Sequence, residues 1–412
     1  MIYRPRHLES IIVEALADTR VVIINGARQA GKSTVVREVV RNRPSARERY
    51  LDQPNDLTAA RLDPASFVEH DGLLVIDEVQ RAPELILPIK ARVDADNRPG
   101  QYLLTGSARL LGLRTLPDAL VGRSETVEMW PFSQGELDGG PDGFVDAVFA
   151  DSVTLTTSGT LDRADYLERI VRGGFPEAVG RSDSRRARFF ESYVRDLIDR
   201  DVTQVGEIQR RDDLSRLLSI LAERTASPLS IDGLASNLSI SKNTVERYVA
   251  LFEEVFLIKR IPAWTSSATT RATRQRKLVF VDSGLCAHLS GSSIERLGRH
   301  PARVGPLMKS FVISEITRQL TWSHVFARMH HYRTRDGDEV DAVLEHHDGR
   351  VVGIEVKAAS SLSPEDVRHL HHLRTKAGDK FHCGVLLYTG TEVLSLGDHL
   401  VAAPLDCLWH SA

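Results

Sequence analysis

Short apolar runs alternate with amphipathic stretches over the first third of the chain. The runs that predict strands lie at 21–25, 49–52, 72–77, 101–106 and 125–129. Apolar residues at helical spacing predict helices at 1–20, 32–42 and 83–96. Strands that alternate with helices are typical of a parallel sheet covered on both faces. The front of the chain is therefore expected to be an α/β domain.

This alternation stops in the second third of the chain, where the composition changes. Glycine, aspartate, serine and threonine are frequent in 138–160, which favours a linker or an insertion. Helical periodicity follows over 161–225, and 226–290 contains the pattern of a helix, a turn and a second helix. Over 302–412 the pattern predicts a helix, three strands, another helix and an apolar strand. We therefore expect a core over 1–137 followed by three further folded regions.

The composition is that of an ordinary globular protein. Of the 412 residues, 42% are hydrophobic and 26% are charged, which argues against a disordered or fibrous chain. The net charge of −3 argues against a protein that coats nucleic acid, but it allows a local basic patch. Cys286, Cys383 and Cys407 lie far apart, so no disulfide framework or zinc ribbon is expected and a reducing, cytoplasmic location fits. Charges throughout the N-terminal segment argue against a signal peptide, and no apolar window is long enough for a membrane span.

A glycine-bearing turn between the first predicted strand and the next helix matches G-x-x-x-x-G-K-[ST] in full. Its backbone N–H groups and the N-terminus of the following helix favour phosphate oxygens. Lys32 would neutralise the charge of the β- and γ-phosphates, and the Ser33 hydroxyl would bind Mg²⁺. The residues expected to cradle the triphosphate are Gly26, Ala27, Arg28, Gln29, Ala30, Gly31, Lys32, Ser33 and Thr34.

Candidate catalytic residues follow three other predicted elements. Asp77 and Glu78 end an apolar strand, so Asp77 is expected to hold Mg²⁺ through its waters and Glu78 to polarise the attacking water. In the motif TGSAR, Ser107 is the first candidate to touch the γ-phosphate and Thr105 the second, with a plain turn as the alternative. Arg123 is a candidate for an arginine that contacts phosphate in cis or in trans, with an ordinary surface arginine as the alternative.

These motifs resemble the AAA-like branch of P-loop ATPases and, within it, one prokaryotic family. The segments that carry the resemblance are GARQAGKST, VIDEVQRAPEL, YLLTGSAR, LVGRSETVEMWPFSQGEL, GGFPE and VDSGL. The resemblance implies hydrolysis of ATP with Mg²⁺, and a C-terminal domain long described as of unknown function. Rings or other homo-oligomers are also frequent among AAA-like proteins. The stretch 138–160 is the part that the resemblance covers least.

The middle of the chain has the order of a helix-turn-helix, and we interpret 226–290 as a winged helix. DNA readers of this kind place the start of the second helix against base edges. The residues expected to face outward there are Lys242, Asn243, Glu246 and Arg247. A basic loop over 262–276 would contact phosphates as a wing. Its cationic residues, together with the residue that follows it, are Arg271, Arg274, Arg276 and Lys277. Contact with DNA or RNA and contact with a protein partner both remain open, because winged helices of AAA-like ATPases often bind proteins.

The last region contains a pattern of acidic residues and lysine on neighbouring strands. Asp341 lies on one predicted strand, and Glu355 and Lys357 point to one face of the next. Asp plus Glu-x-Lys resembles the PD-(D/E)xK restriction-endonuclease-like fold. By that resemblance Asp341 and Glu355 would bind Mg²⁺, Lys357 would position the attacking water, and Glu315 on the preceding helix would complete the metal shell. The alternatives are ordinary edge-strand polarity and a site retained only as a binding surface.

The sequence thus predicts an α/β protein with a P-loop NTPase core of the AAA-like type, a helical lid over 161–225, a winged helix and a restriction-endonuclease-like domain. The expected activity is Mg²⁺-dependent ATP hydrolysis that controls the nucleic-acid- or protein-binding domains behind the core. Two alternatives remain open: a nucleotide-gated DNA-binding regulator with a catalytically silent nuclease-like fold, and an ATP-controlled, metal-dependent nuclease.

Overall fold

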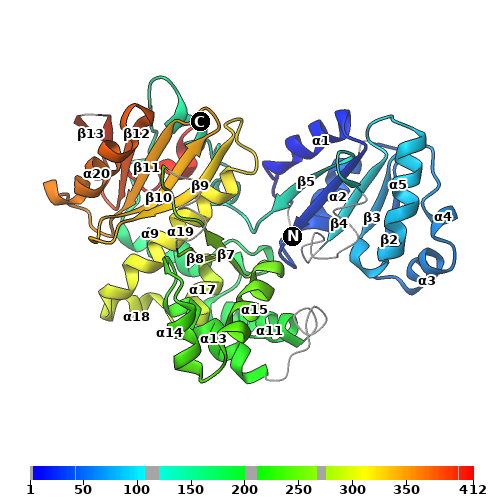
Figure 1. Cartoon of the computed structure of the whole chain (residues 1–412), viewed down its shortest axis with the longest axis horizontal. Helices are drawn as coiled ribbons and strands as arrows, with labels where there is room; N and C mark the ends of the chain where they lie inside the picture. Colours follow the sequence, from blue (N-terminus) through cyan, green and yellow to red (C-terminus); the bar gives the residue numbers. More distant parts are fainter. Residues whose placement is uncertain (1–2, 42, 107–119, 200–210, 267–274, 398) are drawn as a thin grey trace. The chain divides into compact units, whose positions relative to one another are not determined.

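The computed structural model describes residues 3–41, 43–106, 120–199, 211–266, 275–397 and 399–412 (Figure 1). The chain divides into two compact units. The first unit comprises Met1–Pro131 with Glu254–Phe256, and the second comprises Phe132–Glu253 with Leu257–Ala412. No described helix combines the length and the apolar character that a bilayer span requires.

The first unit is built on a five-stranded parallel sheet in the order β2-β3-β4-β1-β5 (Figure 1). The strands are β1 (Val21–Gly26), β2 (Arg47–Tyr50), β3 (Leu74–Asp77), β4 (Tyr102–Gly106) and β5 (Ser124–Met129). All five predicted strands are present, so the prediction of a parallel α/β core is confirmed. Because the strands are parallel, β1, β3 and β4 bring their carboxyl ends to one edge of the sheet.

Helices cover both faces of this sheet. One face packs against α3 (Pro54–Leu62), α4 (Pro64–Phe67) and α5 (Ile86–Ala95), which share an apolar core with β1, β3 and β4. The other face is covered by α1 (Leu8–Asp18) and α2 (Lys32–Val40). The apolar pattern predicted α1, α2 and α5 but not α3 or α4. A proline at the first position of α4, capped by Asp63, separates these two short helices.

The second unit contains a three-stranded antiparallel sheet in the order β6-β8-β7. The helices and strands in this part of the chain are α13 (Arg211–Glu223), β6 (Ser227–Pro228), α14 (Ile231–Leu238), α15 (Lys242–Glu254), β7 (Ile258–Ile261) and β8 (Lys277–Phe280). The predicted helix, turn and helix are therefore present, and Ser241 accepts a hydrogen bond from the Thr244 backbone N–H at the start of α15. The interpretation of this region as a winged helix stays a prediction.

A mixed six-stranded sheet in the order β13-β14-β12-β11-β10-β9 forms the other sheet of the second unit (Figure 1). Its strands are β9 (Ala327–Arg333), β10 (Glu339–His346), β11 (Val351–Val356), β12 (Phe381–Tyr388), β13 (Leu394–Gly397) and β14 (Leu400–Pro404). β10 is antiparallel to β9 and β11, whereas β11, β12 and β14 are parallel. One face of the sheet shares a core with α20 (Arg368–Ala377), and α19 (Val304–Gln319) packs against β10 and β11.

The second unit contains further helices. They are α9 (Arg163–Arg172), α10 (Pro176–Val179), α11 (Asp183–Leu197), α17 (Ser283–Leu289), α18 (Ile294–Arg299) and α21 (Cys407–His410). The buried carboxylate of Asp282 accepts hydrogen bonds from Leu285 N at 2.8 Å and Gly174 N at 2.7 Å. Asp282 therefore caps α17, and it also joins the motifs GGFPE and VDSGL, which lie far apart in the sequence.

The stretch 138–160 is not the simple linker or insertion that its composition predicts. It contains α8 (Phe144–Phe149), whose side chains are buried except that of Asp146, and α8 packs against α19 and α21. Gly143 N donates to Ser411 O at 2.8 Å. The preceding helix α7 (Gln134–Asp138) also belongs to the second unit. The first compact unit ends at Pro131, before the boundary at 137 that the sequence predicts, and buried apolar contacts attach α8 to α19 and α21.

Candidate functional site

The phosphate-binding loop connects β1 to α2 at the carboxyl edge of the parallel sheet. Gly31 adopts a φ of 101° directly before α2, a conformation that glycine adopts without steric cost. Gly26 lies so close to β5 that a Cβ atom there would approach Met129 O to 2.0 Å. The two glycines therefore fix the shape of the turn and the approach of the loop to β5.

The side chain of Lys32 lies inside this loop. Only 6% of Lys32 is exposed, and its Nζ donates to the carbonyl oxygens of Gly26 and Ala27, both at 2.9 Å. An ammonium group has three donors, and here two of them are held by the loop backbone. Lys32 is thus positioned where phosphate oxygens could replace these carbonyls.

Ser33, Asp77 and Thr105 form one hydrogen-bonded group across three elements. Ser33 Oγ lies 3.1 and 3.2 Å from the two carboxylate oxygens of Asp77. Thr105 Oγ1 donates to Asp77 and accepts from the backbone N–H of Glu78 at 3.1 Å. A hydroxyl group beside a carboxylate supplies the hard oxygen donors that Mg²⁺ prefers. The residues present fit a hydrated Mg²⁺, and the metal-binding role of Ser33 and Asp77 stays a prediction.

Glu78 has an unusual backbone conformation directly after β3. Its φ of 58° and ψ of 45° lie in the left-handed region, which a residue other than glycine adopts only when its surroundings hold it there. The hydrogen bond from Glu78 N to Thr105 provides part of that restraint, and the side-chain amide of Gln80 donates to the Glu78 carboxylate. The conformation of Glu78 is therefore restrained directly beside Asp77.

Arg6 is a residue of this site that the sequence did not indicate. It is 5% exposed, and it donates to Ala30 O at 3.0 Å and to Trp130 O at 2.5 Å. These bonds tie the phosphate-binding loop to the end of β5. Arg6 lies before α1 and belongs to none of the motifs, so only the tertiary structure reveals its role.

Two predicted residues are not part of the described site. Arg123 precedes β5 and therefore lies at the amino edge of the sheet, opposite the phosphate-binding loop. Its guanidinium pairs with Asp94, with Nη2 at 3.1 Å from Oδ2. Hydrogen bonds from Arg123, and next from Lys90, lower the pKa of Asp94 to about 2. The structure therefore does not bring Arg123 to the phosphate-binding loop of its own chain, and Ser107 lies outside the described residues.

The C-terminal sheet contains a second group of the predicted residues. Ala342 pairs with Ile354 in the antiparallel β10–β11 ladder, so Asp341 lies opposite Glu355 on the same face. Asp341 is fully buried and Glu355 is 4% exposed. Burial, and next the charge of Asp341, raise the pKa of Glu355 well above its usual range. Lys277 from β8 and Lys309 from α19 both lie against Asp341.

The other two residues predicted for a nuclease metal site point elsewhere. Glu315 accepts from Gln134 N at 2.9 Å and pairs with Arg318, and burial raises its pKa to about 7. Lys357 pairs with Asp366 at 3.1 Å. The prediction that Glu315 completes a metal shell with Asp341 is therefore wrong. Across the described parts of the chain, no three Asp, Glu, His or Cys side chains are grouped in a way that could hold a metal ion.

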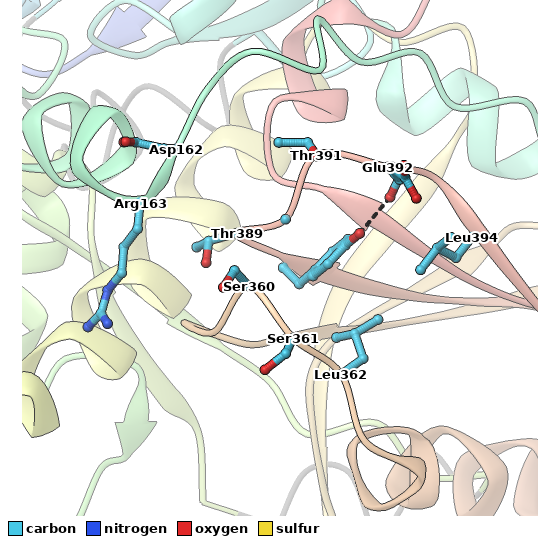
Figure 2. A pocket seen from close by; sticks show the side chains of 11 residues that line it. Asp162, Arg163, Ser360, Ser361, Leu362, Thr389, Thr391, Glu392 and Leu394 are labelled. Carbon is cyan, nitrogen blue, oxygen red and sulfur yellow. Dashed lines mark hydrogen bonds between the residues drawn. The ribbon is translucent and has the colours of Figure 1, made fainter.

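A pocket of about 690 Å³ lies in the second unit where the parallel strands β11 and β12 end (Figure 2). Figure 2 shows Asp162 and Arg163 on one side of the pocket and the segment from Ser360 to Leu362 on another. The dashed line marks the hydrogen bond that the hydroxyl group of Tyr388 donates to the backbone oxygen of Glu392. None of the predicted site residues lines the pocket. Its hydroxyl groups come from separate segments, which is why no sequence motif indicated the pocket.

The start of α15 presents the outward-facing residues that the helix-turn-helix pattern predicts. Asn243, Glu246 and Arg247 are exposed, and the exposed Lys242 pairs with Asp232. Of the loop residues predicted to contact phosphate, Arg271 and Arg274 lie outside the described residues. Arg276 is exposed, whereas Lys277 is fully buried. Lys277 is therefore not part of a phosphate-binding surface in this structure.

The fold and the arrangement of the first site define the class of this domain as an α/β P-loop NTPase core. Residues 18–138 match a family model described as an AAA domain. Two models described as domains of unknown function match the remainder: DUF8612 over 163–296 and DUF4143 over 304–408. The AAA model thus covers the phosphate-binding loop together with Asp77 and Glu78.

Two similar proteins align with most of the chain. An uncharacterized protein of Mycobacterium tuberculosis is 28% identical over 414 residues, covering 98% of this chain and 85% of its own length. An uncharacterized protein of Haemophilus influenzae is 20% identical over 343 residues, covering 77% of this chain and 79% of its own. Both alignments therefore extend beyond the region that the AAA model matches.

Among solved structures, a Walker-type ATPase of Pyrococcus abyssi is similar with a TM-score of 0.42 and 14% identity, covering 70% of this chain and 96% of that chain. The Holliday junction branch migration motor RuvB of Thermotoga maritima is similar with a TM-score of 0.29 and 16% identity, covering 62% of this chain and 87% of that chain.

Proposed function

We propose that this protein is a Mg²⁺-dependent ATPase in which ATP binding and hydrolysis control the conformation of nucleic-acid- or protein-binding surfaces in the second unit. The observation that carries the proposal is the group formed by Ser33, Asp77, Thr105 and Glu78 beside the Lys32 loop. A chance glycine-rich turn would not have a carboxylate hydrogen-bonded to its serine. Nor would a second acidic residue, Glu78, be held beside it in a left-handed backbone conformation.

Each residue of the site has a role in this proposal. Lys32 would exchange its carbonyl contacts for phosphate oxygens, and the loop N–H groups would bind the phosphates. Ser33 and Asp77 would hold Mg²⁺, which when bound neutralises phosphate charge. Glu78 would accept a proton from the attacking water. Thr105 would hold Asp77 and Glu78 in their relative positions through its hydrogen bonds to both.

Two substitutions test the proposal together. Lys32→Ala should abolish ATP binding, because the principal cation of the loop is removed. Glu78→Gln should bind ATP normally and fail to turn it over, because the amide cannot accept the proton. An assay of phosphate release in the presence and absence of DNA or RNA measures both turnover and its stimulation. Equal hydrolysis by the wild type and both variants would refute the proposal.

The exposed start of α15 favours a second candidate function, a nucleotide-gated DNA-binding regulator. Asn243 and Arg247 are exposed there, and an amide and a guanidinium are the groups that read base edges. Binding to duplex DNA that weakens with salt, and that Arg247→Ala weakens further, would support it. DNA binding that is absent at low salt, or unchanged in Arg247→Ala, would favour a protein partner on this surface instead.

A further inference from the structure

Asp341 on β10 of the C-terminal sheet has contacts on both of its carboxylate oxygens. Oδ1 lies 2.8 Å from Lys309 Nζ and 3.5 Å from Lys277 Nζ. Oδ2 accepts from the backbone N–H of Val356 at 3.1 Å. A buried carboxylate is costly unless it is paired and hydrogen-bonded, and here both conditions are met within the chain.

The ammonium group of Lys277 also has its hydrogen-bond acceptors within the chain. Its side chain is fully buried, and its Nζ lies 2.9 Å from Glu339 Oε1, 3.3 Å from Asp341 O and 3.5 Å from Asp341 Oδ1. These three acceptors match the three donors of an ammonium group. Since Lys277 begins β8 and its acceptors lie on β10, the contacts join the three-stranded sheet to the six-stranded sheet.

The residues present do not fit the Mg²⁺ that the nuclease-like resemblance implies. Mg²⁺ requires near-octahedral coordination by oxygen atoms. Asp341 is occupied by two lysines and a backbone N–H, and Glu315 and Lys357 bind other residues. The buried Oε2 of Glu355 has no hydrogen bond, but a single carboxylate oxygen does not supply the near-octahedral oxygen shell that Mg²⁺ requires.

We propose that Lys277 and Lys309 stand where the nuclease-like resemblance places a divalent cation, and that Asp341 joins the two sheets of the second unit instead of binding metal. Contacts next to these ion pairs also connect the two sheets. Trp264 N donates to His331 O at 2.6 Å, and the Trp264 side chain packs in the core of the six-stranded sheet. The segment that follows β7 and the first residue of β8 are therefore both attached to the six-stranded sheet.

Titration of the nucleotide-free, full-length chain with Mn²⁺, followed by electron paramagnetic resonance, tests the metal part of the proposal. All samples carry Asp77→Asn, so that the carboxylate of the ATPase site is removed. The proposal predicts no Mn²⁺ bound at micromolar concentrations. One Mn²⁺ bound per chain and lost on adding Glu355→Gln would overturn it, because the acidic pair would then be a working metal site.

Thermal unfolding tests the anchoring part with a matched pair of lysines. Lys309→Met should lower the unfolding temperature, whereas Lys376→Met on the exposed face of α20 should not. In an Asp341→Asn background, Lys309→Met should cause no further shift. An equal shift in both backgrounds would overturn the proposal. If Asp341→Asn does not yield folded chain, amide exchange in β8 tests the junction instead: Lys277→Met, which removes the ammonium group that connects β8 to β10, should speed it, and exchange as slow as in Lys376→Met would contradict the proposal.

Discussion

Thr105→Val is the substitution that examines the ATPase site most specifically. Thr105 is fully buried, and valine has nearly the same shape, so the change removes the hydroxyl without leaving a cavity. The hydroxyl donates to Asp77 and accepts from Glu78 N at 3.1 Å. A hydrogen bond to a charged group contributes about 1.5–3 kcal/mol, and Asp77 retains its contacts with Ser33, so we expect a loss of stability of about 2 kcal/mol.

The catalytic effect should be larger than the effect on ATP affinity. The left-handed conformation of Glu78 costs on the order of 1–3 kcal/mol and persists only while neighbours such as Thr105 restrain it. Once released, Glu78 would move its carboxylate by about an ångström, which costs roughly 100-fold in rate. Steady-state phosphate release should show kcat lowered by about that factor with KM for ATP nearly unchanged. Thr105→Ser, which keeps the hydroxyl, is the control; turnover by Thr105→Val equal to that of Thr105→Ser would refute this reasoning.

Three further predictions concern residues at defined positions. Arg6→Gln should weaken ATP affinity about tenfold by calorimetry, because the carbonyl of Ala30 loses its donor and the loop shifts; unchanged affinity would contradict the role given to Arg6. Glu315 has its folded pKa raised from 4.5 to about 7, so its contribution to stability is complete below about pH 4.5 and is lost as the pH rises through 7. Denaturation at pH 5 and pH 8 should therefore show a smaller difference in Glu315→Gln than in the wild type, and an equal difference would contradict the assignment. Arg123→Ala should leave turnover within about twofold, because Arg123 pairs with Asp94 at the far edge of the sheet; lost turnover with normal ATP affinity would instead place Arg123 in a neighbouring subunit's site.

The front of the chain could be predicted in some detail because its signals are local. The strand, turn and helix around Lys32 are contiguous, and the apolar run before Asp77 determines where that carboxylate lies. Arg6 could not be predicted in the same way. Its partners Ala30 and Trp130 are distant in sequence, and a single arginine before a helix carries no periodic signal.

The C-terminal site was only partly predictable for a related reason. The alternation of β10 and β11 places Asp341 opposite Glu355, as a pairing of antiparallel strands requires. Its cationic partners come from β8 and α19, and nothing in the sequence pairs those segments with β10. The nuclease-like resemblance placed Glu315 beside Asp341, but the side chain of α19 that contacts Asp341 is Lys309, and Glu315 binds the start of α7.

Composition was misleading for 138–160. Glycine, proline and aspartate around α8 are typical of a connection, yet the apolar side chains of that helix are buried against α19 and α21. A helix of this length has too few turns to show a period, so its burial depends on tertiary packing.

Calorimetric titration of the purified chain with ATP and Mg²⁺, beside Lys32→Ala, measures nucleotide binding at the phosphate-binding loop. We expect saturable binding of one ATP per chain in the wild type and none in Lys32→Ala. The absence of binding in the wild type, or equal binding by both chains, would contradict this expectation.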